Sequence, residues 1–373
     1  MKRMSWLLSL VGLSIILSGC SSRVAVKVPT RSAKGFVATT AYHHHTIEQT
    51  ELHKFVHDKL VTSEGIYTNY LASDKQQSQA TGHEMLLESS GLWLTYLAQT
   101  KQNKAFRRSY QQTVATFGQG DQLSYRYDPT TKKRSNVNAT LDDFRVIRAL
   151  EVYAINTKSH VYAKKAATRF AKLQKHVLAK GRLVDFYDVN AHQASTTSSL
   201  AYYDLLTLRY FESVSKTQRH YYAKQLELVQ AGYLGNAFPL YASSYDWQSG
   251  EYSSKNLNTS EALEVLLHLA EVGQVKQQSV DWLAEQVSAH KLYNSYTIDG
   301  NVVNQDQSSA NYALAALIFA TVHNRAMYQT AMKAVWASQV VNQKSPIFGS
   351  LGDAATGQTY SFNNLTALVA TTY

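Results

Sequence analysis

Helical periodicity runs through almost the whole chain from Ile47 onward, and it limits the possible folds more than any other feature. The first run, "IEQTELHKFVHDKLV", places its apolar residues largely on one helix face. Further helices are predicted at about 84–100, 102–117, 141–156, 160–178, 196–211, 217–232, 258–273, 279–290, 308–323, 325–341 and 360–371. These make about twelve helices in all, and Pro129, Pro239 and Pro346 fall between them, as expected of a helix-breaking residue.

The predicted helices are of two alternating kinds. Runs such as "HEMLLESSGLWLTYLAQ" and "SSANYALAALIFATV" are apolar on more than one face, which is typical of buried helices. The runs that follow such segments, for example "NKAFRRSYQQTVATF", are amphipathic and basic. This alternation predicts two concentric rings, and therefore an all-α fold, the (α/α)6 barrel. A two-layer bundle or an α-solenoid is the structural alternative, and no repeat of sequence letters decides between them.

Signals for β-structure are brief. "LSYRYD" and "RLVDFYDV" have the alternation and composition of short strands, and they fall between predicted helices. We therefore expect only small hairpins or extended loops at the helix ends.

The N-terminus has the pattern of an export signal. A basic "MKR" precedes the apolar run "WLLSLVGLSIIL", which is too short for a comfortable membrane span. The run ends in "LSGC", which resembles the bacterial lipobox and implies that Cys20 carries a lipid. The predicted organisation is a signal peptide at 1–19, a lipidated Cys20 with a flexible linker at 20–46, and a barrel domain at 47–373. An ordinary secretory signal with a chance cysteine is the alternative.

The same reading predicts location and partners. The protein is expected at the cell membrane, lipid-anchored on the extracytoplasmic side or partly shed, and as a monomer. Of the formal net charge of +10, six Lys/Arg residues precede residue 35. The rest of the chain is only mildly basic, so no nucleic-acid partner is expected. Zinc-ligand, P-loop and dinucleotide fingerprints are absent from the sequence, so no metal or cofactor is implied.

The segment "HEMLLESSGL" has a carboxylate within an apolar run. Glu88 is surrounded in sequence by Leu86, Leu87, Leu92 and Trp93. Burial would raise the pKa of its carboxyl and keep it protonated near neutral pH, the state that a general acid requires. The small residues at 89–91 are expected to leave space for a ligand beside it. The alternative is a glutamate that faces water on a partly buried helix.

A second group of candidates lies in "NATLDDFRVIRAL", residues 138–150. Asp142 and Asp143 fall in the first turn of a predicted helix, where the helix dipole stabilises carboxylates. Arg145 or Arg148 could pair with them. Helix capping is the simpler explanation of this pattern, and a binding role is the alternative.

A third group lies in the helix-free stretch "YASSYDWQSGEY". Asp246 stands between Tyr245 and Trp247, and aromatic rings around a carboxylate are typical of sugar sites. Loops over a rigid scaffold are also where functional residues concentrate. The alternative is a turn packed by its own aromatic side chains.

These segments together resemble glycoside hydrolase family 8, in particular its divergent branch found with bacterial exopolysaccharide operons. "LLESSGLWLTYL" resembles the family's acid motif, which implies that Glu88 is the general acid. "ATLDD" resembles the family's "Ala-Thr-Asp-x-Asp", but Leu141 stands where the first Asp belongs, and Asp142 could substitute for it. "SSYDWQSGEY" resembles the region of the family's base and makes Asp246 the candidate, with Glu251 and Glu261 as alternatives. The resemblance spans roughly 55–371.

The resemblance implies an endo-glycosidase that hydrolyses a β-linked bacterial exopolysaccharide with inversion of the anomeric carbon. Its two carboxyl groups would be about 6.5–9.5 Å apart across a cleft. Asp142, Asp143 and Arg145 are expected to bind substrate, as are the aromatic residues Trp93, Tyr203, Tyr245 and Trp247. A non-catalytic polysaccharide-binding lipoprotein of an exopolysaccharide synthesis or attachment system is the main alternative, and a polysaccharide lyase is a further one.

Overall fold

The computed structural model describes residues 26–72 and 82–373 of the chain. This part of the chain contains twelve α-helices. Their bounds are α1 (Ile47–Phe55), α2 (Leu87–Gln99), α3 (Asn103–Phe117), α4 (Thr140–Thr157), α5 (His160–Val177), α6 (Leu205–Phe211), α7 (Lys216–Ala231), α8 (Thr259–Glu271), α9 (Gln277–Ser288), α10 (Ser309–Thr321), α11 (Arg325–Ala337) and α12 (Ser361–Ala370).

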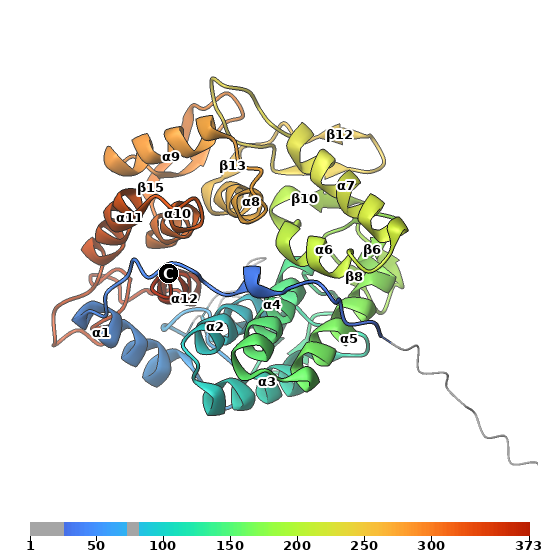
Figure 1. Cartoon of the computed structure of the whole chain (residues 1–373). Coiled ribbons are helices and arrows are strands. Elements are labelled where there is room, and N and C mark those ends of the chain that lie inside the picture. The colour runs from blue at the N-terminus through green and yellow to red at the C-terminus, as the bar shows by residue number, and fades with distance from the viewer. Residues whose placement is uncertain (1–25, 73–81) are drawn as a thin grey trace, which may run out of the picture.

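The helices form two concentric rings, with the even-numbered helices inside and the odd-numbered helices outside (Figure 1). Burial follows from the sequence pattern of each kind. In the inner helix α10 every residue from Ser309 to Ala320 is buried. The outer helix α3 buries only one stripe, which includes Phe106, Tyr110 and Phe117. The predicted (α/α)6 barrel of about twelve helices is thus confirmed.

One predicted helix differs clearly from the structure. Of the predicted span 196–211, only α6 is α-helical; it follows strand β10 (Thr197–Ser199) and a 3-10 turn, η3 (Leu200–Tyr202). The difference arises because β10 pairs antiparallel with β11 (Ser244–Asp246), from a distant part of the sequence. The side chain of Asp204 then starts α6 by accepting a hydrogen bond from the backbone N–H of Thr207 at 3.0 Å.

Short strands form small antiparallel sheets between the helices. Besides β10 and β11 they are β1 (Met85–Leu86), β2 (Gly118–Gln119), β3 (Gln122–Leu123), β4 (Arg126–Asp128), β5 (Lys133–Arg134), β6 (Leu178–Ala179), β7 (Arg182–Leu183), β8 (Tyr187–Asp188), β9 (Gln193–Ala194), β12 (Glu251–Tyr252), β13 (Leu257–Asn258), β14 (Tyr293–Tyr296) and β15 (Val302–Gln307). The predicted strand signals contain Leu123 of β3 and the whole of β4, β7 and β8. Strands β1, β13 and β15 lead directly into α2, α8 and α10, so they lie where these inner helices begin.

The opposite end of the barrel, where inner helices end, is crossed by residues 33–46, here called the strap. In Figure 1 the strap is the blue segment that passes α4 and the C-terminus. The side-chain amide of Gln99, at the end of α2, donates to the carbonyl of Phe36 at 3.0 Å. The backbone N–H groups of Tyr42 and His43 donate to the carbonyl of Tyr373 at 2.9 and 2.8 Å.

The strap is also held by apolar contact. Phe36 is buried, and its ring meets Tyr210 edge-on with 5.3 Å between ring centroids. These contacts differ from the expected flexible linker at 20–46, because an aromatic ring and several backbone groups of the strap are satisfied on the barrel. Cys20 and the signal segment lie outside the described residues. Within the described ranges, no helix is long and apolar enough to cross a membrane.

Candidate active site

A cleft of about 1240 Å³ opens at the end of the barrel where the inner helices begin. Its floor is formed by residues in the first two turns of three inner helices. These are Glu88 from α2, Asp142 and Arg145 from α4, and Glu261 and Glu264 from α8. The positive ends of the helix dipoles therefore converge on a group of carboxylates, which favours their charged forms.

Arg145 lies at the centre of this floor. Its Nη1 donates to Asp142 Oδ1 at 2.7 Å and lies 3.3 Å from Glu88 Oε1, and its Nη2 donates to Glu264 Oε1 at 2.7 Å. Among the described residues that line the cleft, Arg145 is the only cationic side chain. One guanidinium thus faces three carboxyl groups, and the cleft has an excess of acidic groups.

Glu88 has the protonation behaviour of a general acid. Burial raises the pKa of its carboxyl to about 7, because the charged form loses hydration. The charge of Arg145 acts in the opposite direction, while Asp142, Glu264 and Glu261 reinforce the rise. Burial likewise raises the pKa of Asp142 to about 6, against the effect of Arg145. The cluster therefore retains a proton near neutral pH, as acid catalysis requires.

Glu261 is the most open carboxylate of the cleft floor. It lies in the first turn of α8, and its backbone N–H donates to the N-cap side chain of Asn258 at 3.3 Å. Its side chain is exposed, so water can reach it. Partial desolvation and then the neighbouring charge of Glu264 raise the pKa of Glu261. A carboxylate in contact with water, in the same cleft as a protonated carboxyl, has the properties of a general base.

The small residues after Glu88 do not open space for a ligand, which corrects the expectation from the sequence. Ser89 is fully buried, and its Oγ lies 2.8 Å from the Oγ of Ser361 on α12. Gly91 faces α4 so closely that a Cβ at this position would lie 2.7 Å from the Cβ of Arg145. The small side chains instead allow α2 to pack tightly against its two neighbours in the inner ring.

Asp246 does not line the cleft. It lies in the β11–β12 hairpin, where its Oδ1 accepts hydrogen bonds from the backbone N–H groups of Gln248 and Ser249 at 2.7 and 2.9 Å. These bonds hold the pKa of Asp246 below its usual value, because they favour the charged carboxylate. The structure therefore does not bring Asp246 together with Glu88.

The aromatic residues beside Asp246 pack within the same region. Trp247 donates through its Nε1 to Ser198 Oγ at 2.6 Å and lies under the guanidinium of Arg182. Tyr245 meets Trp247 edge-on, with 5.0 Å between the ring centroids. This is the arrangement of a turn packed by its own aromatic side chains, the alternative considered from the sequence.

The remaining predicted substrate residues are divided between the cleft and the core. Asp142 and Arg145 line the cleft, as does Leu141. Asp143 is buried outside it and accepts a hydrogen bond from Asn138 Nδ2 at 2.8 Å; burial raises its pKa to about 7. Trp93 packs on Tyr96, and Tyr203 is fully buried, so neither reaches the cleft.

Sequence reasoning missed most of the polar walls of the cleft. Amide and hydroxyl side chains dominate these walls. The amides include Asn294 from β14 and Asn304 and Gln307 from β15. The hydroxyls include those of Tyr125, Tyr202 and Tyr360. The sequence predicts Glu261 only as an alternative base, and it does not single out Glu264. A usable signal was present in "SEALEVLLHLAEV", where ionisable residues at 261, 264, 268 and 271 share one face of an otherwise apolar helix.

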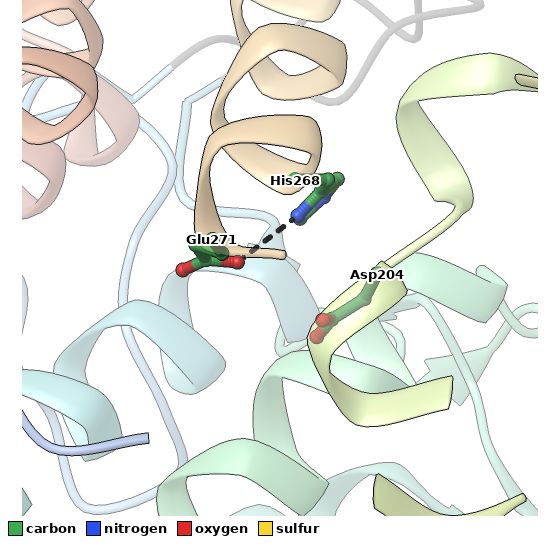
Figure 2. Close-up of side chains that lie close together, drawn as sticks. All are labelled: Asp204, His268 and Glu271. Atoms are coloured by element: carbon green, nitrogen blue, oxygen red, sulfur yellow. Dashed lines mark ion pairs between the residues drawn. The ribbon is translucent and has the colours of Figure 1, made fainter. Parts of the chain in front are cut away.

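Within the described residues, Asp204, His268 and Glu271 form the one cluster that has the side chains of a metal site (Figure 2). Their candidate ligand atoms all lie within 4.8 Å of one another. Arg148, however, already ion-pairs with Asp204 at 3.3 Å and makes two hydrogen bonds to Glu271. Since the protein's own guanidinium neutralises both carboxylates, the cluster fits an internal ion-pair network better than a bound cation.

Comparison with known proteins identifies the fold. No family model and no curated protein matches the sequence, whereas solved structures match it closely. A structure described as a novel α-amylase from Clostridium perfringens has 26% identity and a TM-score of 0.81, and covers 90% of this chain and 99% of its own. PssZ from Listeria monocytogenes has 17% identity and a TM-score of 0.67, covering 89% and 97%.

The endoglucanase Cel10 from Klebsiella pneumoniae, a family 8 glycosyl hydrolase, has 14% identity and a TM-score of 0.60, and covers 86% of this chain and 97% of its own. The family resemblance read from the sequence thus agrees with these structural neighbours. The chain has the fold of the family 8 glycoside hydrolases, an (α/α)6 barrel.

Proposed function

We propose that this chain is a glycoside hydrolase that cleaves a polysaccharide with inversion, with Glu88 as general acid and Glu261 as general base. The observation that carries the proposal is the cleft floor, where a partly buried carboxyl with a pKa of about 7 shares one cavity with a water-accessible carboxylate. Glu261 takes the place of Asp246 as the proposed base, because Glu261 lines the cleft with Glu88 and Asp246 does not.

The reaction follows from these two protonation states. Glu88 donates its proton to the glycosidic oxygen as the bond from that oxygen to the anomeric carbon breaks. Glu261 accepts a proton from a water molecule whose oxygen forms the new bond to the anomeric carbon from the opposite face. Exchange with solvent then returns a proton to Glu88 and removes one from Glu261. Arg145 would hold the carboxyls of the floor in place throughout.

Two substrate classes are proposed. The sequence resemblance favours a β-linked bacterial exopolysaccharide cut internally, whereas the neighbour at 26% identity is described as an α-amylase, which favours an α-linked glucan. The amide-rich walls would suit either, because neutral hydroxyl groups of any glycan can exchange hydrogen bonds with amide side chains. An assay on both classes of polymer is therefore needed to identify the glycosidic linkage that is cleaved.

The decisive assay offers the protein purified exopolysaccharide, a β-glucan and starch, and follows products by mass spectrometry and their first-formed anomer by NMR. We expect one polymer to be cleaved with inversion. Glu88→Gln and Glu261→Gln should each lower kcat by about 10²–10⁴-fold. Asp246→Asn is the matched control and should retain activity. A Glu88→Gln protein that releases as much reducing sugar as wild type would refute the mechanism.

A non-catalytic role is the second candidate, and Leu141 is the observation that favours it. An apolar side chain lines the cleft where the resembling motif has a sugar-binding aspartate. In that case the wild-type protein would bind one of the polymers, for example in affinity electrophoresis, and would release no product from it.

The proposal includes the lipid anchor on Cys20 and a position on the extracytoplasmic side of the membrane, supported by the "LSGC" sequence. Cys20→Ala should move the protein from the membrane fraction or change its mass by the loss of lipid. A wild-type protein of unmodified mass in the soluble fraction would contradict the anchor.

A further inference from the structure

A line of buried ionisable side chains leads from the cleft into the barrel. Glu264, His268 and Glu271 lie on one face of α8, at spacings of four and three residues. The side chain of His268 is only 4% exposed. Its Nε2 lies 3.6 Å from Glu264 Oε2, and its Nδ1 lies 3.6 Å from Glu271 Oε2, as the dashed line to Glu271 in Figure 2 illustrates.

Each of these two glutamates is also held by an arginine of α4. Glu264 pairs with Arg145 at the cleft floor, while Glu271 pairs with Arg148. The charges therefore alternate along a continuous path, from Arg145 to Glu264, His268, Glu271 and Arg148. His268 is the only described link between the cleft cluster and the inner cluster at Arg148.

The surroundings of His268 favour its imidazolium form. Glu264 and Glu271 face it from its own helix, Asp204 faces it from the start of α6, and Arg148 lies beyond Glu271. Tyr373, which is also buried, interacts with the Arg148–Glu271 pair. Burial lowers the pKa of His268, but the three carboxylates outweigh this effect and the pKa is raised. Among the described residues neither ring nitrogen has a hydrogen-bond partner, so a neutral ring would leave both buried without compensation.

We propose that His268 is a positioning residue: as an imidazolium between Glu264 and Glu271, it holds Glu264 against Arg145 and so sets the charge around Glu88. This proposal rests on the proposed function, because it assigns His268 an effect on the catalytic acid. His268 itself does not line the cleft.

The test compares pH profiles of kcat/KM for His268→Gln and His268→Lys. Removing a buried positive charge makes the carboxyl cluster bind protons more tightly. The alkaline limb, which reports loss of the proton from Glu88, should therefore move up by about half to one pH unit in His268→Gln. His268→Lys retains a positive charge and should restore the wild-type limb.

A purely structural role predicts a different result. Glu212→Ala is the control, since Glu212 is buried beside Gln225 and outside this network, and truncating its side chain leaves a cavity. It should lower the melting temperature without moving the limb. The proposal would be overturned by a His268→Gln protein that loses stability while the alkaline limb of its kcat/KM profile stays at the wild-type pH or moves to a lower pH.

A second measurement does not depend on catalysis. A histidine with a raised folded-state pKa contributes stability that is complete below about pH 6.5 and is lost as pH rises through the folded-state pKa. The melting temperature of wild type should exceed that of His268→Gln by more at pH 5.5 than at pH 9. If this difference between the two pH values is found and no glycan is cleaved, the proposed function fails, while the assignment of His268 as an imidazolium is retained. A pH-independent difference would refute the imidazolium whatever the activity.

Discussion

Gly91 determines how closely α2 and α4 approach, and through that contact it determines where Arg145 lies. The Cβ that an alanine would add lies 2.7 Å from the Cβ of Arg145, well inside van der Waals contact. Because Arg145 contacts the three carboxyls of the cleft floor, a packing constraint one turn from Glu88 becomes a constraint on the site.

Gly91→Ala should therefore destabilise the protein and weaken the site together. We expect the free energy of unfolding to fall by about 1–3 kcal/mol, because the two helices must separate to admit the methyl group. Chemical denaturation measures the change. Gly35→Ala is the control, since its Cβ would meet only Leu206 Cδ1 at an ordinary 3.4 Å. Equal stability of the two variants would contradict this view of the contact.

Glu264 gives a second residue-scale prediction, with a defined sign. Glu264→Gln removes a negative charge that raises the pKa of Glu88, and it leaves Arg145 freer to pair with Glu88. Both effects lower the pKa of Glu88. The alkaline limb of kcat/KM should move down by about one pH unit. A limb that moves up in this variant would show that Glu264 does not act on Glu88 through charge.

For single residues, what the sequence could predict depended on the neighbours of each residue along the chain. Glu88 could be singled out because a carboxylate inside "MLLESSGLW" conflicts with its apolar neighbours. Asp246 was selected by its aromatic neighbours, but these rings pack against Ser198, Arg182 and one another, which only a distant strand makes possible. The neighbours of a residue in the sequence therefore identified a partly buried acid, but they did not identify which loop faces the cleft.

At the scale of elements, the β14–β15 hairpin forms a wall of the cleft. Every residue of β15 is exposed, and Asn304 and Gln307 line the cavity beside Asn294 and Ser295. The strand register shifts between Ser295 and Tyr296, which bends the hairpin. The wall can thus be altered with little effect on the core.

Asn304→Ala should raise KM with little change in kcat or stability. One neutral hydrogen bond to substrate contributes about 0.5–1.5 kcal/mol, which corresponds to about 2–10-fold in KM. Steady-state kinetics on the cleaved polymer measures the effect. Val303→Ala is the neighbouring control, because Val303 is half exposed and does not line the cleft. A similar rise in both variants would point to a general disturbance of the hairpin.

The helices themselves were largely predictable, since a buried helix and an amphipathic one differ in periodicity over a dozen residues. The prediction was wrong at 196–204, where Thr197–Ser199 joins a strand donated from residues 244–246. Local periodicity carries no information about such a partner. The β14–β15 hairpin was not predicted, for a related reason. Its second strand is polar and solvated, so it has no apolar alternation to detect.

At the scale of the whole molecule, buried carboxyls make stability depend on pH. Burial raises the pKa of Glu151 to about 8, and its Oε1 has no hydrogen-bond partner in the part of the chain that the structure describes. A carboxyl whose folded-state pKa is raised binds more protons in the folded state than in the unfolded state. Between its unfolded pKa of about 4.3 and pH 8, stability therefore falls as pH rises. His268 acts in the same direction.

The wild-type protein should accordingly be more stable at pH 5 than at pH 8. Glu151→Gln should reduce this loss by about 1 kcal/mol or more, because the neutral amide does not titrate. Denaturation at both pH values measures the difference. Glu251→Gln, at an exposed position of β12, is the control and should retain the wild-type dependence. An unchanged dependence in Glu151→Gln would mean that Glu151 ionises freely.

The strap also has a mechanical consequence. Any force on the chain before residue 26 is carried first by the packing of Val26 and Pro29 and then by the strap, whose hydrogen bonds to Gln99 and Tyr373 lie at the end opposite the cleft. The tension is thus carried by those hydrogen bonds and by the packing of Phe36 before the tension acts on any inner helix. A protein pulled from its N-terminus, by a tether or by flow along a surface, would lose these N-terminal contacts and then the strap before the carboxyl cluster at the opposite end is loaded.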